Sequence, residues 1–183
     1  RNALQLNNGD GTFSDIAFLS HVSSTDWSWA SLFADYDNDG DKDLMVTNGF
    51  YRDLGDQDYI HYQAKLNNPM GNQSAKRAEK LKAVKALANI PLQDYLFENN
   101  NDLTFTKRST DWGFNEPGFS NGACYADLDN DGDLELIINQ FNSKAKIFKN
   151  NANELLKNNY LSIKLKGKQL NTDAIGSKVY VFT

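Results

Sequence analysis

The sequence predicts a mainly β fold built from four-stranded, blade-like units, and three observations lead to this prediction. An acidic motif occurs twice along the chain. A turn motif rich in asparagine and glycine also occurs twice, at the same offset. Short apolar runs flank both motifs, as strands flank turns. Four short strands per repeat are typical of a propeller blade or a stacked β array, so we expect part of a β-propeller with one helical insertion.

The duplicated unit is visible in two aligned pairs of segments. The acidic segment Asp35–Leu44 aligns with Asp127–Leu136, and the turn segment Asn7–Phe13 aligns with Asn99–Phe105. Two separate motifs that share one offset indicate a duplicated unit. A third copy of the turn segment begins at Lys149 and stops early.

The order of elements within a unit follows from the motifs. Two short strands enclose the asparagine-rich turn, because Gly and Asn tolerate the positive φ of a tight hairpin. A third strand leads into the acidic loop, and a fourth strand leaves it. The expected strands are Leu4–Leu6, Thr12–Ile16, Ser28–Ala34 and Leu44–Thr47 in the first unit, and Leu96–Glu98, Thr104–Lys107, Asn121–Ala126 and Leu134–Asn139 in the second.

The unit boundaries are expected at about 1–94 and 95–151. The first unit contains an insertion at about 52–94, where apolar residues at helical spacing predict a helix over Asn72–Asn89. From residue 152 the pattern changes. Tyr160–Gly167 alternates strictly and Lys178–Phe182 reads as another strand, so 152–183 is expected to begin a different β domain.

Composition excludes several classes of protein. The hydrophobic fraction of 40% and the aromatic fraction of 12% predict a folded chain. A single cysteine, Cys124, excludes an internal disulfide framework and a cysteine-rich zinc site. No apolar run reaches the ~18 residues of a membrane span, so no transmembrane segment is expected. Asp26 and Asp111 have no partner at a spacing that would make a catalytic set, so no catalytic residue is assigned.

The two acidic loops contain the candidate metal ligands. Numbered from the first aspartate, positions 1, 3, 5, 7 and 9 are acidic and position 6 is glycine, which permits a sharp turn. Calcium takes six to eight oxygen ligands at ~2.3–2.6 Å, so this pattern favours two Ca²⁺ sites. An EF-hand is excluded, because position 12 is Val46 or Ile138 and a strand follows. The candidate metal residues are Asp35, Asp37, Asp39, Asp41, Asp43, Asp127, Asp129, Asp131, Asp133 and Glu135.

Charge supports a metal in these loops. Closely spaced carboxylates repel one another unless a cation compensates them. Two divalent ions would offset most of the net charge of −5. The competing interpretation is a pair of solvated acidic turns without metal.

The motifs Ala34–Leu44 and Ala126–Leu136, with the hairpin Asn7–Phe13, resemble the FG-GAP-like (VCBS) repeats of integrin-α-type β-propellers. The tail from Asn159 to Gly167, with Ala174–Gly176, looks like the start of the ASPIC/UnbV domain that follows such repeats. The Phe-Gly and Gly-Ala-Pro element that names the repeat is not intact here. The resemblance implies calcium in each loop and a binding or scaffolding role without catalysis.

The resemblance also implies an exported chain: secreted, periplasmic or at the cell surface, from a bacterium similar to the Bacteroidetes. We expect a calcium-binding extracellular module that binds a protein or a glycan. Alternatives are an accessory part of a carbohydrate-active enzyme, in which Trp112 would stack on sugar rings, and a purely structural calcium-stiffened spacer. Nucleic acid is not an expected partner, because the net charge is negative despite a basic helix face that includes Lys80.

Overall fold

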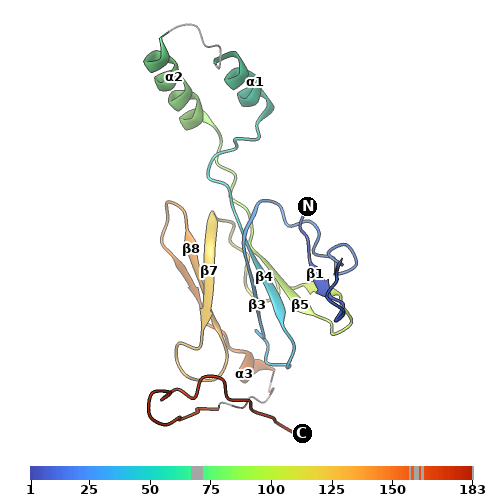
Figure 1. The fold of residues 1–183 in the computed structure, drawn as a ribbon. Helices are drawn as coiled ribbons and strands as arrows, with labels where there is room; N and C mark the ends of the chain where they lie inside the picture. The colour runs from blue at the N-terminus through green and yellow to red at the C-terminus, as the bar shows by residue number, and fades with distance from the viewer. Residues whose placement is uncertain (67–71, 157, 159–160, 162, 183) are drawn as a thin grey trace.

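The computed structural model describes residues 1–66, 72–156, 158, 161 and 163–182 (Figure 1). Short strands dominate the chain, with one pair of helices between β4 and β5 and a short helix after β9. The elements are β1 Gln5–Asn7, β2 Phe13–Asp15, β3 Ser28–Ala34, β4 Asp43–Asn48, α1 Gln57–Leu66, α2 Gln73–Ala86, β5 Tyr95–Asn99, β6 Phe105–Lys107, β7 Ser120–Ala126, β8 Glu135–Gln140, β9 Lys146–Phe148 and α3 Ala152–Leu155.

The predicted mainly β fold class is confirmed. The strands form three antiparallel sheets of two, four and three strands, in the orders β1-β2, β3-β4-β5-β6 and β7-β8-β9. All eight expected strands of the two units form, with ends that differ by a few residues. Sheets of this kind, one after another along the chain, are consistent with part of a β-propeller.

The sheets are out of phase with the sequence repeats. Strands β3 and β4 come from the first repeat, but β5 and β6 come from the second, and β4 pairs with β5 through Met45 and Leu96. In the same way, β8 pairs with β9, the strand that leads directly into the third, shortened turn segment. Each acidic loop therefore joins two strands of one sheet, and the hairpin of the next repeat completes that sheet.

Two apolar clusters hold the sheets together. One contains Leu44, Val46, Phe97 and Phe105, and the β1-β2 side of the molecule contributes Val22 to it. The other lies between the four-stranded and three-stranded sheets. It contains Tyr36, Met45, Leu96, Phe114, Leu136 and Ile138. Strand β4 is buried along its whole length, because alternate side chains enter the two clusters.

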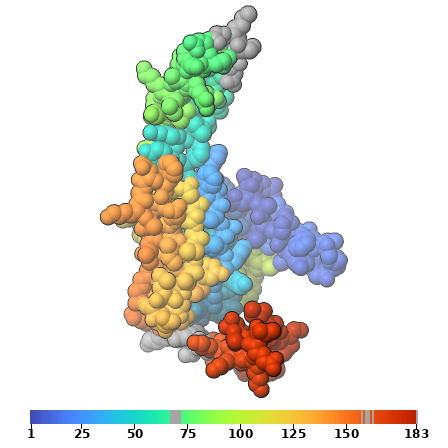
Figure 2. Space-filling model, turned by 60° about the vertical axis from the view of Figure 1, so that its left-hand side comes forward, coloured from blue at the N-terminus to red at the C-terminus, as the bar shows by residue number. Residues whose placement is uncertain are grey.

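The insertion forms a helical arm, described over residues 52–66 and 72–94, whose helices α1 and α2 project away from the sheets (Figures 1 and 2). Helix α2 lies within the predicted Asn72–Asn89, and the Asn72 side chain caps its start by accepting from the backbone N–H groups of Ser74 and Ala75. The helix ends at Ala86, because Leu87 is extended with ψ 145°. Helix α1 was not predicted from the sequence, and Tyr59 is its only buried residue.

The C-terminal expectations are not met in the described residues. Leu161 and residues 163–182 form no strand, so the strands expected over 160–167 and 178–182 are wrong there; Tyr160 and Ser162 lie outside the described part. Ile163 and Val179 are exposed. Alternation predicts a strand only if a neighbouring strand can pair with it, and the described chain supplies none here.

Candidate metal centre

The first acidic loop is wound around its own carboxylates. Asp35 accepts from the backbone N–H groups of Asp39 (3.2 Å) and Gly40 (3.1 Å), and Asp37 accepts from Asp39 (3.2 Å). Asn38 and Gly40 have φ of 57° and 100°, a left-handed conformation that asparagine and glycine adopt most readily. As a result, oxygens of Asp35, Asp37 and Asp39 lie within 4.8 Å of one another.

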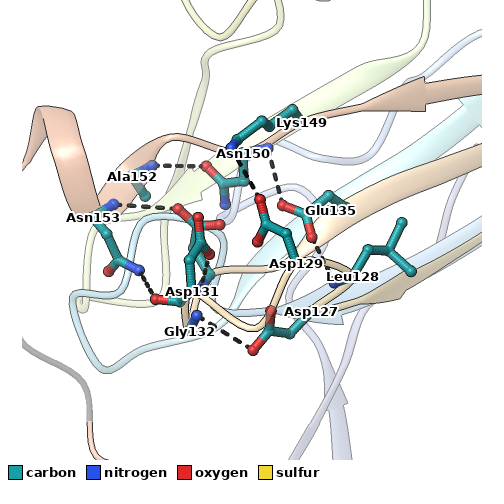
Figure 3. A network of polar contacts seen from close by, with 11 residues as sticks. Asp127, Leu128, Asp129, Asp131, Gly132, Glu135, Lys149, Asn150, Ala152 and Asn153 are labelled. Carbon is teal, nitrogen blue, oxygen red and sulfur yellow. Dashed lines mark hydrogen bonds and ion pairs between the residues drawn. The ribbon is translucent and has the colours of Figure 1, made fainter.

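The second loop repeats this winding (Figure 3). Asp127 accepts from the N–H of Gly132 at 3.3 Å, and Asn130 and Gly132 again have positive φ, 61° and 93°. Two groups of three carboxylates meet the same 4.8 Å criterion and share Glu135. They are Asp127, Asp129, Glu135 and Asp131, Asp133, Glu135.

The acid at position 9 fastens each loop to the following hairpin. Asp43 is 1% exposed, and its two oxygens accept from the backbone N–H groups of Tyr36 and Asn99, both at 3.0 Å. Glu135 does the same with Leu128 at 2.7 Å and Asn150 at 3.3 Å. Asp43 and Asp41 therefore lie outside the close group of the first loop, whereas Glu135 belongs to both groups of the second.

Burial opposes ionisation in the first loop. Desolvation, followed by repulsion from Asp39, raises the pKa of Asp37 to about 6. Desolvation also raises the pKa of Asp43 to about 7, although two backbone N–H groups favour its charged form. In the second loop desolvation raises the pKa of Asp133 to about 6, while a hydrogen bond from Lys149 lowers the pKa of Asp129.

The residues fit a hard cation. The Oδ1 atoms of Asp41 and Asp133, both at position 7, are buried and have no hydrogen-bond partner among the described residues. An unpaired buried carboxylate oxygen is costly, and a bound cation would satisfy it. The same atom is left unpaired at position 7 of both loops, and in the first loop Asp41 lies outside the close carboxylate group. The donors are all oxygen, which suits Ca²⁺ or Mg²⁺ rather than a softer metal.

The loops also contact each other, which the sequence analysis did not predict. The Asn38 amide of the first loop donates to the Gly132 carbonyl of the second at 3.3 Å. Asn153, from the start of α3, bonds to Asn38 and to the second loop. A lone asparagine in a polar segment belongs to no motif, so only the folded arrangement reveals this contact.

The aromatic candidate Trp112 packs against the second apolar cluster and lines a cavity of about 370 Å³ between the two larger sheets. Phe114, Phe148 and Leu136 line the same cavity, and so does Tyr36, whose hydroxyl is buried without a partner among the described residues. Trp112 therefore packs against the core and also lines this cavity.

Together these features define a class: a β-propeller-like repeat module whose acidic loops could hold metal ions. The model of the FG-GAP-like repeat family matches residues 1–46 and 86–138, more than half of the chain, and the chain belongs to this family. The match omits nearly all of both helices of the arm, in agreement with an insertion. Members are typically non-catalytic. No curated protein matches the chain.

Proposed function

We propose that this chain is a calcium-binding, non-catalytic module that stands outside the cytoplasm and binds a protein or a glycan. The observation that carries the calcium part is the pair of unpaired, buried Oδ1 atoms at Asp41 and Asp133, each in a loop of convergent carboxylates. A bound ion would neutralise the repulsion that, with burial, raises the pKa of Asp37.

The ligands in this proposal are the carboxylates already described, with Ca²⁺ as the ion of each loop. The ion would fix the loop between the third and fourth strands of a repeat, so that the sheets form a rigid support for longer connections. The helical arm is the longest of these connections and projects clear of the sheets, so it is the first surface to test for a partner (Figure 2). No described helix has the length and apolar character needed to cross a membrane.

The domain assignment stays part of the proposal: FG-GAP/VCBS-like repeats over 1–151, and an ASPIC/UnbV-like domain that begins in 152–183. Its support is the sequence of the tail, including Ala174–Gly176, and the exposed apolar side chains there, such as Ile175 and Phe182. Exposed apolar side chains gathered in one segment are typical of a surface that packs against another part of a protein.

A sugar-directed role is the second candidate, because the cavity beside Trp112 combines an aromatic face with Asp37, Asp111 and Lys149 at its edge. Aromatic rings pack against the apolar faces of sugars, and flanking polar groups bond to hydroxyls. Glycan binding that is lost in Trp112→Ala but kept in Trp27→Ala would favour this role. Trp27 is a suitable control, since it is an exposed tryptophan outside the cavity.

Thermal unfolding in excess chelator, in 2 mM Ca²⁺ and in 2 mM Mg²⁺ tests the calcium proposal. With dissociation constants of ~0.1–1 mM, that calcium concentration adds about 0.6–2 kcal/mol per site, or several degrees in Tm. The double variant Asp37→Ala plus Asp129→Ala should lose the shift. Asp26→Ala plus Asp111→Ala, acids outside both loops, should keep it. A parent protein that holds no metal on elemental analysis and shows no shift would overturn the proposal.

A further inference from the structure

The segment that follows β9, described over residues 150–156 and at Asn158, bonds to both acidic loops through its asparagines, and Figure 3 shows its bonds to the second loop. We propose that this segment, which we name the asparagine strap, couples the two loops, so that an ion bound in one loop strengthens binding in the other. The inference rests on the proposed function, because it concerns how the two loops share their ions.

Asn153 is the centre of the strap. Its side-chain oxygen accepts from the Asn38 amide of the first loop at 2.8 Å. Its own amide donates to the Asp131 carbonyl of the second loop at 2.6 Å, and its backbone N–H donates to Asp133 at 3.3 Å. One planar amide therefore contacts both loops, and a shift of either loop changes the position available to the other.

Two further asparagines add contacts on either side. The Asn150 amide donates to the Tyr36 carbonyl of the first loop at 2.7 Å, while its backbone N–H donates to Glu135 of the second at 3.3 Å. The Asn158 amide donates to the Asp37 carbonyl at 2.9 Å. Tyr36 and Asp37 lie between the first and third carboxylates of their loop, so the strap bonds to the backbone that positions these candidate ligands.

These contacts predict positive coupling. An ion that fixes one loop also fixes the strap, and the second loop then loses less conformational freedom when it binds its own ion. Repulsion between the ions opposes this effect. Both loops have exposed carboxylates, such as Asp39 and Asp129, so water and salt reach the loops and screen this repulsion.

Calcium titration of the full chain, followed by nuclear magnetic resonance, measures the coupling. The backbone amides of Gly40 and Gly132, at position 6 of each loop, report on the two loops separately. With the first site removed by Asp37→Ala plus Asp39→Ala, the second loop should bind calcium at least about fivefold more weakly than in the parent. Linkage requires the same factor at the first loop when Asp129→Ala plus Asp131→Ala removes the second site.

The strap variant completes the cycle. In an Asn153→Ala background, removal of one site should change the affinity of the other by much less than in the parent, because Asn150 is then the remaining strap residue that contacts both loops. Asn142→Ala is the matched control, since this asparagine bonds to Tyr51 at the opposite end of the sheets. If Asn153→Ala does not fold, Asn38→Gly breaks the same bridge from the first loop, accepts the left-handed backbone at this position and leaves the bonds of Asn153 to the second loop.

The outcomes separate the two proposals. Calcium binding in both loops, each indifferent to the other, overturns the coupling and leaves the proposed function in place. Coupling of unchanged size in both Asn153→Ala and Asn38→Gly overturns the role of the strap. Weaker binding in one loop when the other is filled also contradicts the inference. No calcium in either loop overturns the proposed function and the coupling with it.

Discussion

The two acidic loops share nearly the same sequence and the same backbone turn, but they differ in how their charge is balanced. At position 3 of the first loop, Asp37 is 7% exposed and has a raised pKa. At position 3 of the second, Asp129 is exposed and has a lowered pKa, because the Lys149 ammonium lies 2.9 Å from it. A repeated motif thus fixes the course of the backbone, while the neighbours of each copy decide how much it needs an added cation.

The largest expected difference lies in the hairpins of the two repeats. Phe105 is 8% exposed in an apolar cluster, whereas Phe13, at the same position of the first hairpin, is 61% exposed. Phe105→Ala should lower the free energy of unfolding by about 3–5 kcal/mol, and Phe13→Ala by no more than about 0.5 kcal/mol. Urea denaturation of the two variants measures both values. Equal losses would show that the hairpins have equivalent surroundings.

The next difference concerns the acids that fasten the loops. Asp43→Ala leaves two backbone N–H groups without an acceptor and should cost about 2 kcal/mol in chelator at pH 7. Glu135→Ala should cost about 1 kcal/mol, because one of its two bonds is longer, at 3.3 Å. Both values come from chemical denaturation. A larger loss for Glu135→Ala would reverse the comparison.

The pH dependence of the metal-free protein should come from buried loop carboxyls with raised pKa values: Asp37 and Asp43 in the first loop and Asp133 in the second. The folded-state pKa values of Asp37 (about 6) and Asp43 (about 7) lie above the unfolded value, so their contribution to stability is complete below pH 4 and is lost as pH rises through these values. Between pH 5 and pH 8 in chelator, Tm should therefore fall. The free energy of unfolding should decrease by on the order of 1 kcal/mol for each of these carboxyls.

Matched variants show which carboxyl causes the fall of Tm with pH. Asp37→Asn should reduce the fall in Tm between pH 5 and pH 8, and Asp43 and Asp133 should account for the part that remains. Asp129→Asn should not reduce the fall, because its lowered pKa acts with the opposite sign and only below about pH 4. A slope that survives Asp37→Asn unchanged and disappears in Asp129→Asn would contradict the assignment.

The smallest expected effect is at Lys149. Its ammonium competes with calcium for Asp129, so Lys149→Met should tighten calcium binding in the second loop by about twofold to fourfold, as expected of an exposed ion pair. Lys144→Met, an exposed lysine in the β8–β9 connection, is the control and should change affinity less. Titration of the Gly132 amide resolves the two variants. Weaker binding in Lys149→Met would mean that the lysine organises the loop instead.

The sequence predicted the strands well, because their cause is local. Glycine and asparagine turns and apolar alternation lie within each unit, and they placed β3 and β7 within a residue or so. The pairing of β4 with β5 could not be predicted, since a tandem repeat does not show where one sheet ends and the next begins. Helix α1 was missed because residues such as Tyr59, Ile60 and His61 have lower helix propensity than the alanine, lysine and glutamate residues that fill α2.

The candidate site was predictable in part for the same reason. The spacing of the carboxylates is local, and the structure brings Asp35, Asp37 and Asp39 together as that spacing implies. The pairing of Asp129 with Lys149 and the bridge at Asn153 join segments that are separated along the chain. Only the fold of the sheets places them side by side.

The helical arm has a consequence for how this architecture tolerates change. Residues 49–94 connect β4 to β5, and residues 141–145 make the equivalent connection between β8 and β9. Both connections join neighbouring antiparallel strands, so their two ends are held at the spacing of a hairpin whatever lies between. A loop several times longer costs only about 2 kcal/mol in closure entropy. This position is therefore a natural graft point, where evolution or an engineer can exchange a short turn for an entire accessory element without rebuilding the sheet.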